Sequence, residues 1–378
     1  MNLSLKNMKS FSTSENARNY RKSVFLKLLK SSAKASCIVF LFFLTNVMVY
    51  GQSDTIRIGK QDPMTAEKLY NEGIALYSEG DFPAAMQKFT ESISNRDDFY
   101  QAYYNRGVVK DIMKDYRGAI EDFNRALVLK PRNPETYLAR GKANLALKNL
   151  ETALGDFTRA IESDKKLHLA YYYRGVVHFL NEAYDDAIMD FSETINLKPD
   201  HAYAYNDRGS CKKEQGELEA AAADYQQAIV LDPTMYFTYN NLGTIRKMQE
   251  KYEEAHEYYS IAIRVNNDYY KAYNNRGIVR TIQGKYQEAV KDFNKALELN
   301  PDFLDAYNNR GIAKYKMAKY KEAVEDYDFV IDKDPDNGFA YLNRGISKEM
   351  LRNPKGAEED WRKAFSLGIT EAEEYYKK

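Results

Sequence analysis

Histidines and neighbouring acids are the residues of this sequence that could do acid–base or metal chemistry. The histidines show no spacing typical of metal ligands: His168, His178, His201 and His256. Adjacent acids fall on predicted exposed helix faces, where solvation is their ordinary role, as for Glu253–Glu254 and Glu358–Glu359. The sequence contains no glycine-rich phosphate loop and no nucleophile motif. We therefore predict no enzyme, no catalytic residue, no metal site and no cofactor.

A unit of 34 residues repeats along most of the chain and positions the remaining polar residues. Glycine recurs at this interval without a gap, at Gly73, Gly107, Gly141, Gly175, Gly209, Gly243, Gly277, Gly311 and Gly345. Alanine forms a second series, at Ala85, Ala119, Ala153, Ala187, Ala221, Ala255, Ala289, Ala323 and Ala357. A fixed period of this length is typical of a solenoid, in which each unit buries its apolar face against its neighbours.

Each repeat is predicted to form two amphipathic helices separated by a turn. In residues 270–303, Gly277 falls on one helical face, and Ala289 and Phe293 fall on another. Gly284 stands where the first helix should end. Glycine inside a helix costs about 1 kcal/mol relative to alanine, so we predict that the paired helices approach closely at the two series. The nine repeats are 66–99, 100–133, 134–167, 168–201, 202–235, 236–269, 270–303, 304–337 and 338–371.

The order of aromatic, glycine, alanine, aromatic, alanine and proline resembles the tetratricopeptide repeat (TPR) family. In residues 270–303 these places are filled by Tyr273, Gly277, Ala289, Phe293, Ala296 and Pro301. The resemblance covers residues 66–371, although four repeats lack the proline and Leu69 replaces the first aromatic. It implies an all-α fold, a right-handed superhelical solenoid of nine helix-turn-helix repeats whose first helices line a concave groove.

The resemblance also implies that the sixth repeat position, with the fifth beside it, faces a polypeptide partner in that groove. An asparagine amide can donate to and accept from one peptide unit. The sixth position holds Asn71, Asn105, Asn241, Asn275, Asn309 and Asn343, with Asp207 in the same register. The fifth position changes from residues such as Tyr104 and Tyr172 to Asn206, Asn240, Asn274 and Asn308. Asparagine is common in the family here, so a ladder without a ligand is the alternative.

Two other positions of the repeat, the seventh and the twenty-third, vary together. Seven repeats hold arginine and aspartate there: Arg106 with Asp122, Arg140 with Asp156, Arg174 with Asp190, Arg208 with Asp224, Arg276 with Asp292, Arg310 with Asp326 and Arg344 with Asp360. The charges are exchanged in Glu72 and Lys88, and both are lost in Leu242 and Tyr258. These linked changes predict a salt bridge between the two helices of one repeat, with an apolar contact in 236–269.

The N-terminal segment differs in composition from the repeats. Residues 1–52 hold eight basic residues and one acid, whereas the rest holds 47 basic and 54 acidic residues, a net charge of −7. That balance speaks against a nucleic-acid partner. Residues 35–50 are apolar and predict export, within a basic segment plus signal peptide over 1–51 or an uncleaved anchor. A linker follows over 52–65, and 372–378 is predicted to end a C-terminal capping helix.

The sequence thus predicts an exported scaffold or adaptor, periplasmic or secreted, that binds a protein or peptide partner in its groove. The alternative is a chaperone or assembly factor that holds unfolded or secreted chains. Membrane contact is expected only through residues 35–50 if they are uncleaved, and self-association is expected if the C-terminal segment leaves the last repeat uncovered. Cys211 occupies a position that is small or apolar in the other repeats, and we predict that it is buried.

Overall fold

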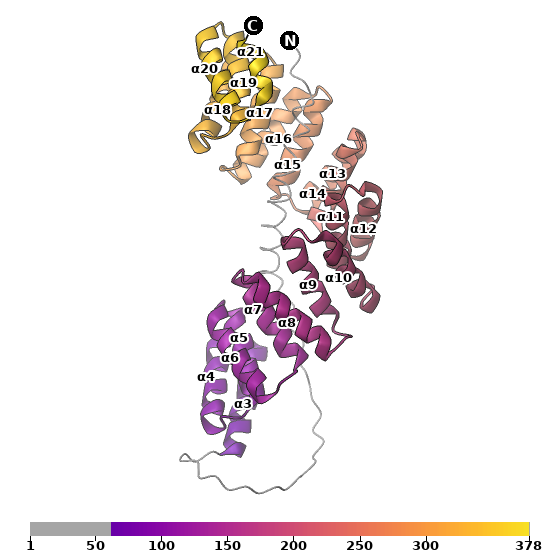
Figure 1. The fold of residues 1–378 in the computed structure, drawn as a ribbon, viewed down its shortest axis with the longest axis vertical. Coiled ribbons are helices and arrows are strands. Elements are labelled where there is room, and N and C mark those ends of the chain that lie inside the picture. Colours follow the sequence, from indigo (N-terminus) through magenta and orange to yellow (C-terminus); the bar gives the residue numbers. More distant parts are fainter. Residues whose placement is uncertain (1–61, 378) are drawn as a thin grey trace. The chain divides into compact units, whose positions relative to one another are not determined.

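The computed structural model describes residues 62–377, which form helices and connecting turns without a β-strand. The chain divides into two compact units, Met1–Glu214 and Gln215–Lys378, and each is described by itself. Helices in each unit follow one another as antiparallel pairs (Figure 1). The all-α repeat fold is therefore confirmed. The predicted segment 1–51, and the linker up to residue 61, lie outside the described residues.

Four helix pairs and one further helix make up the described part of the first unit. The pairs are α3 (Pro63–Glu79) with α4 (Phe82–Asn95), α5 (Tyr100–Ile112) with α6 (Tyr116–Leu129), α7 (Pro134–Ala146) with α8 (Leu150–Ser163), and α9 (His168–Leu180) with α10 (Tyr184–Leu197), followed by α11 (Ala202–Glu214). Helix α3 begins three residues before the predicted repeat start at 66. Pro63 is its first residue, because proline lacks the N–H that this position leaves unpaired.

The second unit starts with one helix and continues with four pairs. They are α12 (Leu218–Leu231), then α13 (Tyr236–Met248) with α14 (Tyr252–Val265), α15 (Tyr270–Ile282) with α16 (Tyr286–Leu299), α17 (Leu304–Lys316) with α18 (Tyr320–Lys333), and α19 (Gly338–Met350) with α20 (Pro354–Ser366). The 3-10 turn η1 (Thr370–Ala372) and α21 (Glu373–Tyr376) follow. Tyr375 packs on Trp361 of α20 with ring centroids 5.2 Å apart, so this segment covers part of α20.

The first helix of a repeat ends in a left-handed residue. Gly284 has φ 77°, as predicted from its place in the repeat, and Gly80 and Gly216 behave in the same way. Other repeats place residues with a side chain in this conformation, including Ala318 at φ 58°. A non-glycine residue costs roughly 1–2 kcal/mol there, so the helix ends carry strain in those repeats.

The repeating glycine packs against an aromatic ring of its own repeat. A Cβ atom added to Gly277 would lie 2.6 Å from Cε1 of Phe293, and the same clash recurs at Gly107 with Phe123. The close approach that we predicted is thus between the first helix and a ring on the second helix. The facing alanine series is fully buried, as at Ala289, which leaves no room for a larger side chain.

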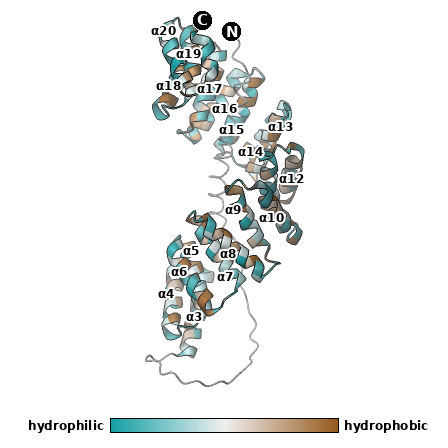
Figure 2. Cartoon of the chain, in the orientation of Figure 1, coloured by the Kyte–Doolittle hydropathy of each residue, from teal (hydrophilic) through white to brown (hydrophobic). Residues whose placement is uncertain are grey.

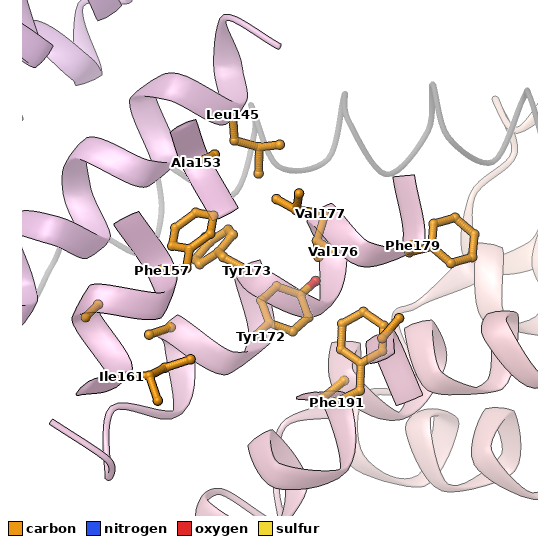
Figure 3. Packing of buried hydrophobic residues seen from close by; sticks show 14 of the residues in the cluster. Leu145, Ala153, Phe157, Ile161, Tyr172, Tyr173, Val176, Val177, Phe179 and Phe191 are labelled. Carbon is orange, nitrogen blue, oxygen red and sulfur yellow. The ribbon is translucent and has the colours of Figure 1, made fainter. Parts of the chain in front are cut away.

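A continuous apolar core joins α7, α8, α9, α10 and α11 in the first unit. Figure 3 shows Tyr173 of α9 beside Phe157 of α8, and Tyr172 beside Phe191 of α10. Cys211 belongs to this core and is buried, as predicted. Each helix therefore buries apolar side chains against the next helix, which is the packing of a repeat array.

Hydrophobic and hydrophilic residues are interspersed along the helices (Figure 2). Within residues 62–377, none of the helices has the length and apolar character that a membrane span requires.

Candidate functional site

The first helices of successive repeats contact one another in each unit. These contacts join α5 with α7, α7 with α9 and α9 with α11, and in the second unit α13 with α15, α15 with α17 and α17 with α19. We call the surface that these helices share the first-helix face, made by α3, α5, α7, α9 and α11 in one unit and by α13, α15, α17 and α19 in the other. The fifth and sixth repeat positions lie where these helices meet.

The predicted asparagine ladder is a chain of hydrogen bonds between repeats in the second unit. Nδ2 of Asn275 donates to Oδ1 of Asn240 at 2.9 Å, and Nδ2 of Asn309 donates to Oδ1 of Asn274 at 3.0 Å. Each bond joins the fifth position of one repeat to the sixth position of the next. The ladder amides thus hold neighbouring first helices in register, an interaction that the sequence analysis did not foresee.

The first unit uses the same two positions with different chemistry. Nδ2 of Asn105 donates to the hydroxyl of Tyr70 at 2.8 Å, and the hydroxyl of Tyr172 donates to Asp207 at 2.8 Å. Asn206 donates to the same aspartate from within its own helix, at 2.8 Å. The hydrogen bond between repeats is therefore conserved in the first unit, although its donor is an asparagine in one pair and a tyrosine in the other.

Burial separates the predicted site residues into two groups. Asn206, Asn240, Asn274 and Asn308, at the fifth position, are between 0% and 7% exposed. Asn343 and Tyr172 are also buried, whereas Asn71 is exposed and the half-buried residues are Tyr104, Asn105, Asn241, Asn275 and Asn309. The fifth-position amides thus lie beneath the surface, and the sixth-position amides other than Asn343 reach it. A role for either group in binding stays a prediction.

Asn308 breaks the pattern of the ladder. Neither its Nδ2 nor its Oδ1 atom has a hydrogen-bond partner among the described residues, although both atoms are buried. Asn343 of the next repeat does not make the bond that Asn309 makes to Asn274. The last step of the ladder therefore leaves a buried amide unsatisfied, at a cost of about 1–3 kcal/mol.

The predicted salt bridges within repeats are confirmed. In the 270–303 repeat, Arg276 donates to Asp292 through Nε at 3.0 Å and Nη2 at 2.7 Å. The other pairs are Arg106–Asp122, Arg140–Asp156, Arg174–Asp190, Arg310–Asp326 and Arg344–Asp360, with the reversed Lys88–Glu72 pair at 2.8 Å. Leu242 and Tyr258 share an apolar cluster, as predicted. The pair predicted for Arg208 and Asp224 joins residues of different units and stays a prediction.

Each of these aspartates also receives a second polar group that sequence reasoning missed. Arg280, at the eleventh repeat position, donates to Asp292 at 2.7 Å, and Lys110 contacts Asp122 at 2.8 Å. Asn144 replaces the cation in 134–167 and donates to Asp156 at 3.3 Å. The position holds Leu76 in the first repeat and lysine, arginine, histidine or asparagine in the others, so its main signal was a bias toward basic residues.

The arginine of the pair also reaches the preceding repeat. Nη1 of Arg276 donates to the hydroxyl of Ser260 at 3.1 Å, and the guanidinium lies over the ring of Tyr273 with its centroid 5.7 Å away. The same donation recurs from Arg140 to Asn124 at 2.6 Å. One arginine therefore fixes both the helix pair within its repeat and the contact between repeats.

Histidines and acids do not assemble a metal site in the described part of the chain. His201 and His168 have ring centroids 5.9 Å apart, but Nδ1 of His201 accepts the backbone N–H of Ala204 at 3.1 Å. Burial, together with His168, lowers the pKa of His201 to about 4. This neutral imidazole serves to start helix α11.

Comparison with known families identifies the repeats. The tetratricopeptide repeat description matches residues 100–133, 202–235, 270–303 and 304–337 individually and residues 138–195 together, just over half of the chain. The chain belongs to the tetratricopeptide repeat family. Because the family is built on this helix pair, the TPR assignment agrees with the geometry of α3 to α20.

Solved TPR structures resemble this chain in fold. A tetratricopeptide repeat protein from Parabacteroides merdae is 19% identical, covers 65% of this chain and 97% of its own, and gives a TM-score of 0.52. A chain of the APC/C hetero-tetramer Cut9–Hcn1 is 14% identical, covers 85% of this chain and 77% of its own, and gives 0.56. A comparison with curated proteins finds no match.

Proposed function

We propose that this TPR protein is a scaffold or adaptor that binds a polypeptide partner on its first-helix face. The observation that carries the proposal is the set of half-buried sixth-position amides on that face, at Asn105, Asn241, Asn275 and Asn309. Asn275 and Asn309 each donate one amide hydrogen within the ladder, and their side-chain carbonyl oxygens can accept a hydrogen bond from another donor. Ile278 and Ile312 lie half-buried nearby in sequence; Ile278 packs on the core cluster with Phe293, and the exposed parts of both side chains would add contact area for a partner.

Export to the periplasm or beyond is part of the same proposal. This part is supported by the apolar stretch at 35–50 and by the basic residues that precede it. The protein would carry these residues as a membrane anchor if they are retained and would be free of the membrane if they are cleaved. Mass spectrometry of the protein from the membrane and soluble envelope fractions shows whether the N-terminal segment is retained or cleaved. Recovery of the protein from the cytoplasm would contradict export.

Site-specific photocrosslinking in cells tests the binding face. A photoreactive phenylalanine analogue replaces Tyr315, a half-buried residue of α17, or Val128 of α6, which is 67% exposed and serves as the matched control. The proposal expects a defined cross-linked partner from position 315 and little from position 128. Equal cross-linking at both positions, or none at 315 and at the matching residues of the other first helices, would contradict the proposal.

The same experiment separates the scaffold from the chaperone. A single partner with a fixed stoichiometry in the purified complex supports a scaffold. Many unfolded chains, bound weakly and released in buffer, would support the chaperone or assembly factor. Cross-links between two copies of the chain at its C-terminal end would instead reveal the self-association that the sequence analysis left open.

A further inference from the structure

Asp111 is a carboxylate on the first-helix face of the first unit for which the fold provides no partner. It lies near the end of α5, and no hydrogen bond or ion pair to its side chain occurs within residues 62–377. Asp122 of the same repeat shows the contrast, because Arg106 and Lys110 hold it at 2.7 and 2.8 Å. Burial raises the pKa of Asp111 above its usual value. Partial desolvation of a carboxylate that has no partner costs free energy.

The residue types at the same repeat position show that folding does not require this carboxylate. The twelfth position holds Tyr77, Leu145 and Phe179 in the other helix pairs of the first unit, whereas α11 and several later repeats hold polar residues there, such as Lys213 and Glu349. Leu145 and Phe179 are buried in the core between helices. An apolar residue is therefore compatible with the packing at this position, and the fold itself gives no reason for the aspartate.

The surroundings of Asp111 favour a cation over other groups. Burial raises the pKa of Tyr104, and the carboxylates of Glu135 and Asp111 raise it further; its ring lies half-buried on this face. Lys142 is the basic group that acts on Asp111 electrostatically, but it forms no ion pair with it and lies 5.5 Å from the ring centroid of Tyr173. Carboxylates beside an aromatic ring attract an ammonium or guanidinium group.

We propose that the first-helix face of α3, α5 and α7 binds a partner segment through a lysine or arginine side chain, which pairs with Asp111 and packs on Tyr104. This inference rests on the proposed function and adds the chemistry of the partner. In the complex, the carboxylate of Asp111 forms an ion pair that it lacks in the free protein. Binding therefore discriminates a basic segment from an apolar or acidic segment of the same shape.

The test uses the full chain and three short peptides, acetyl-Ala-Ala-Xaa-Ala-Ala-amide with lysine, norleucine or glutamate at Xaa. Backbone amide signals of α5 and α7 are followed by NMR during titration. We expect the lysine peptide to bind at least fivefold more tightly than the norleucine peptide and the glutamate peptide to bind most weakly. In the lysine complex, the pKa of Asp111 is expected to fall, as read from its carboxyl carbon signal.

Two variants distinguish binding from structure. Asp111→Leu is expected to raise the Tm and to abolish the preference for lysine, whereas a structural aspartate would lower the Tm when replaced. Glu121→Gln is the control, because it removes the same charge from an exposed position on α6 and is expected to leave the preference unchanged. Equal affinity for the lysine and norleucine peptides, or an unchanged preference in Asp111→Leu, would overturn the inference. The photocrosslinking result does not depend on these peptides, so the proposed function would stand or fall separately.

Discussion

Replacing Arg276 tests whether the repeated arginine–aspartate pair holds the TPR array together. Asp292 is 4% exposed and accepts three hydrogen bonds, two from Arg276 and one from Arg280. Removing one partner of a buried pair costs about 3–5 kcal/mol. Because Arg280 stays in place, we expect Arg276→Leu to cost about 2–3 kcal/mol, including the lost bond to Ser260.

The chain itself supplies the compensating change. Repeat 236–269 holds leucine and tyrosine at these two positions, and its Arg246 contacts Glu254 at 3.0 Å. In the double variant Arg276→Leu with Asp292→Tyr, Arg280 can turn to Glu288, which occupies the place of Glu254 in this repeat. We expect the double variant to cost about 1 kcal/mol, since a well-packed apolar pair can replace a buried ion pair at little cost.

Native-state hydrogen exchange of α15 and α16 measures these costs locally, which suits a repeat array whose unfolding need not be two-state. Lys295→Leu is the control, because it breaks an exposed pair with Glu298 and is expected to change the opening free energy by less than about 0.5 kcal/mol. A double variant that is less stable than Arg276→Leu would refute the reasoning, because the two positions would then act independently.

Three further predictions concern single residues. Asn308→Leu is expected to raise the free energy of unfolding by about 1 kcal/mol, because the amide of Asn308 has no hydrogen-bond partner. Asn274→Leu is expected to lower it by about 1–2 kcal/mol, because Asn309 loses its acceptor. Opposite signs in urea unfolding would contradict these hydrogen-bond assignments. Ala318→Gly is expected to gain about 1 kcal/mol by relieving its left-handed backbone, and an unchanged Tm would contradict this strain. The pKa of His201 is lowered from 6.5 to about 4, so the unfolded chain binds the proton more readily than the folded chain. The free energy of unfolding should be highest above pH 6.5 and fall by at most about 3 kcal/mol as the pH approaches 4. His201→Asn should reduce this pH dependence.

The period of the sequence predicted the helices because each repeat carries the same packing constraints. Gly277 and Phe293 recur together in the repeat since a Cβ atom and a ring cannot share one space. The pair Arg276–Asp292 was predictable for a different reason, because one repeat reverses the charges and another removes both. Arg280 gave a weaker signal. Its position changes among basic residues and asparagine while the aspartate stays the same, and only Leu76, in the repeat with reversed charges, varies together with it.

The asparagine ladder could not be predicted from repeats aligned one above another. Its hydrogen bonds join residues that are 35 apart in the sequence, as from Asn309 to Asn274. The two partners therefore occupy different positions of the 34-residue repeat. A comparison of the fifth position with the sixth position of the following repeat would have revealed it. Tyr70 with Asn105 and Tyr172 with Asp207 each form a complementary donor and acceptor.

Residues that differ from their counterparts in other repeats are therefore the better candidates for specific binding. A side chain that recurs in each repeat is largely used by the array itself, as the ladder and the arginine network show. Position twelve illustrates the opposite case, because it holds Asp111 in one unit and Lys247 in the other. Burial lowers the pKa of Lys247 to about 8, and no ion pair to it occurs in the described part of the chain. Uncompensated charges of opposite sign on the first-helix face cost stability, and a partner that brings the complementary charge offsets that cost.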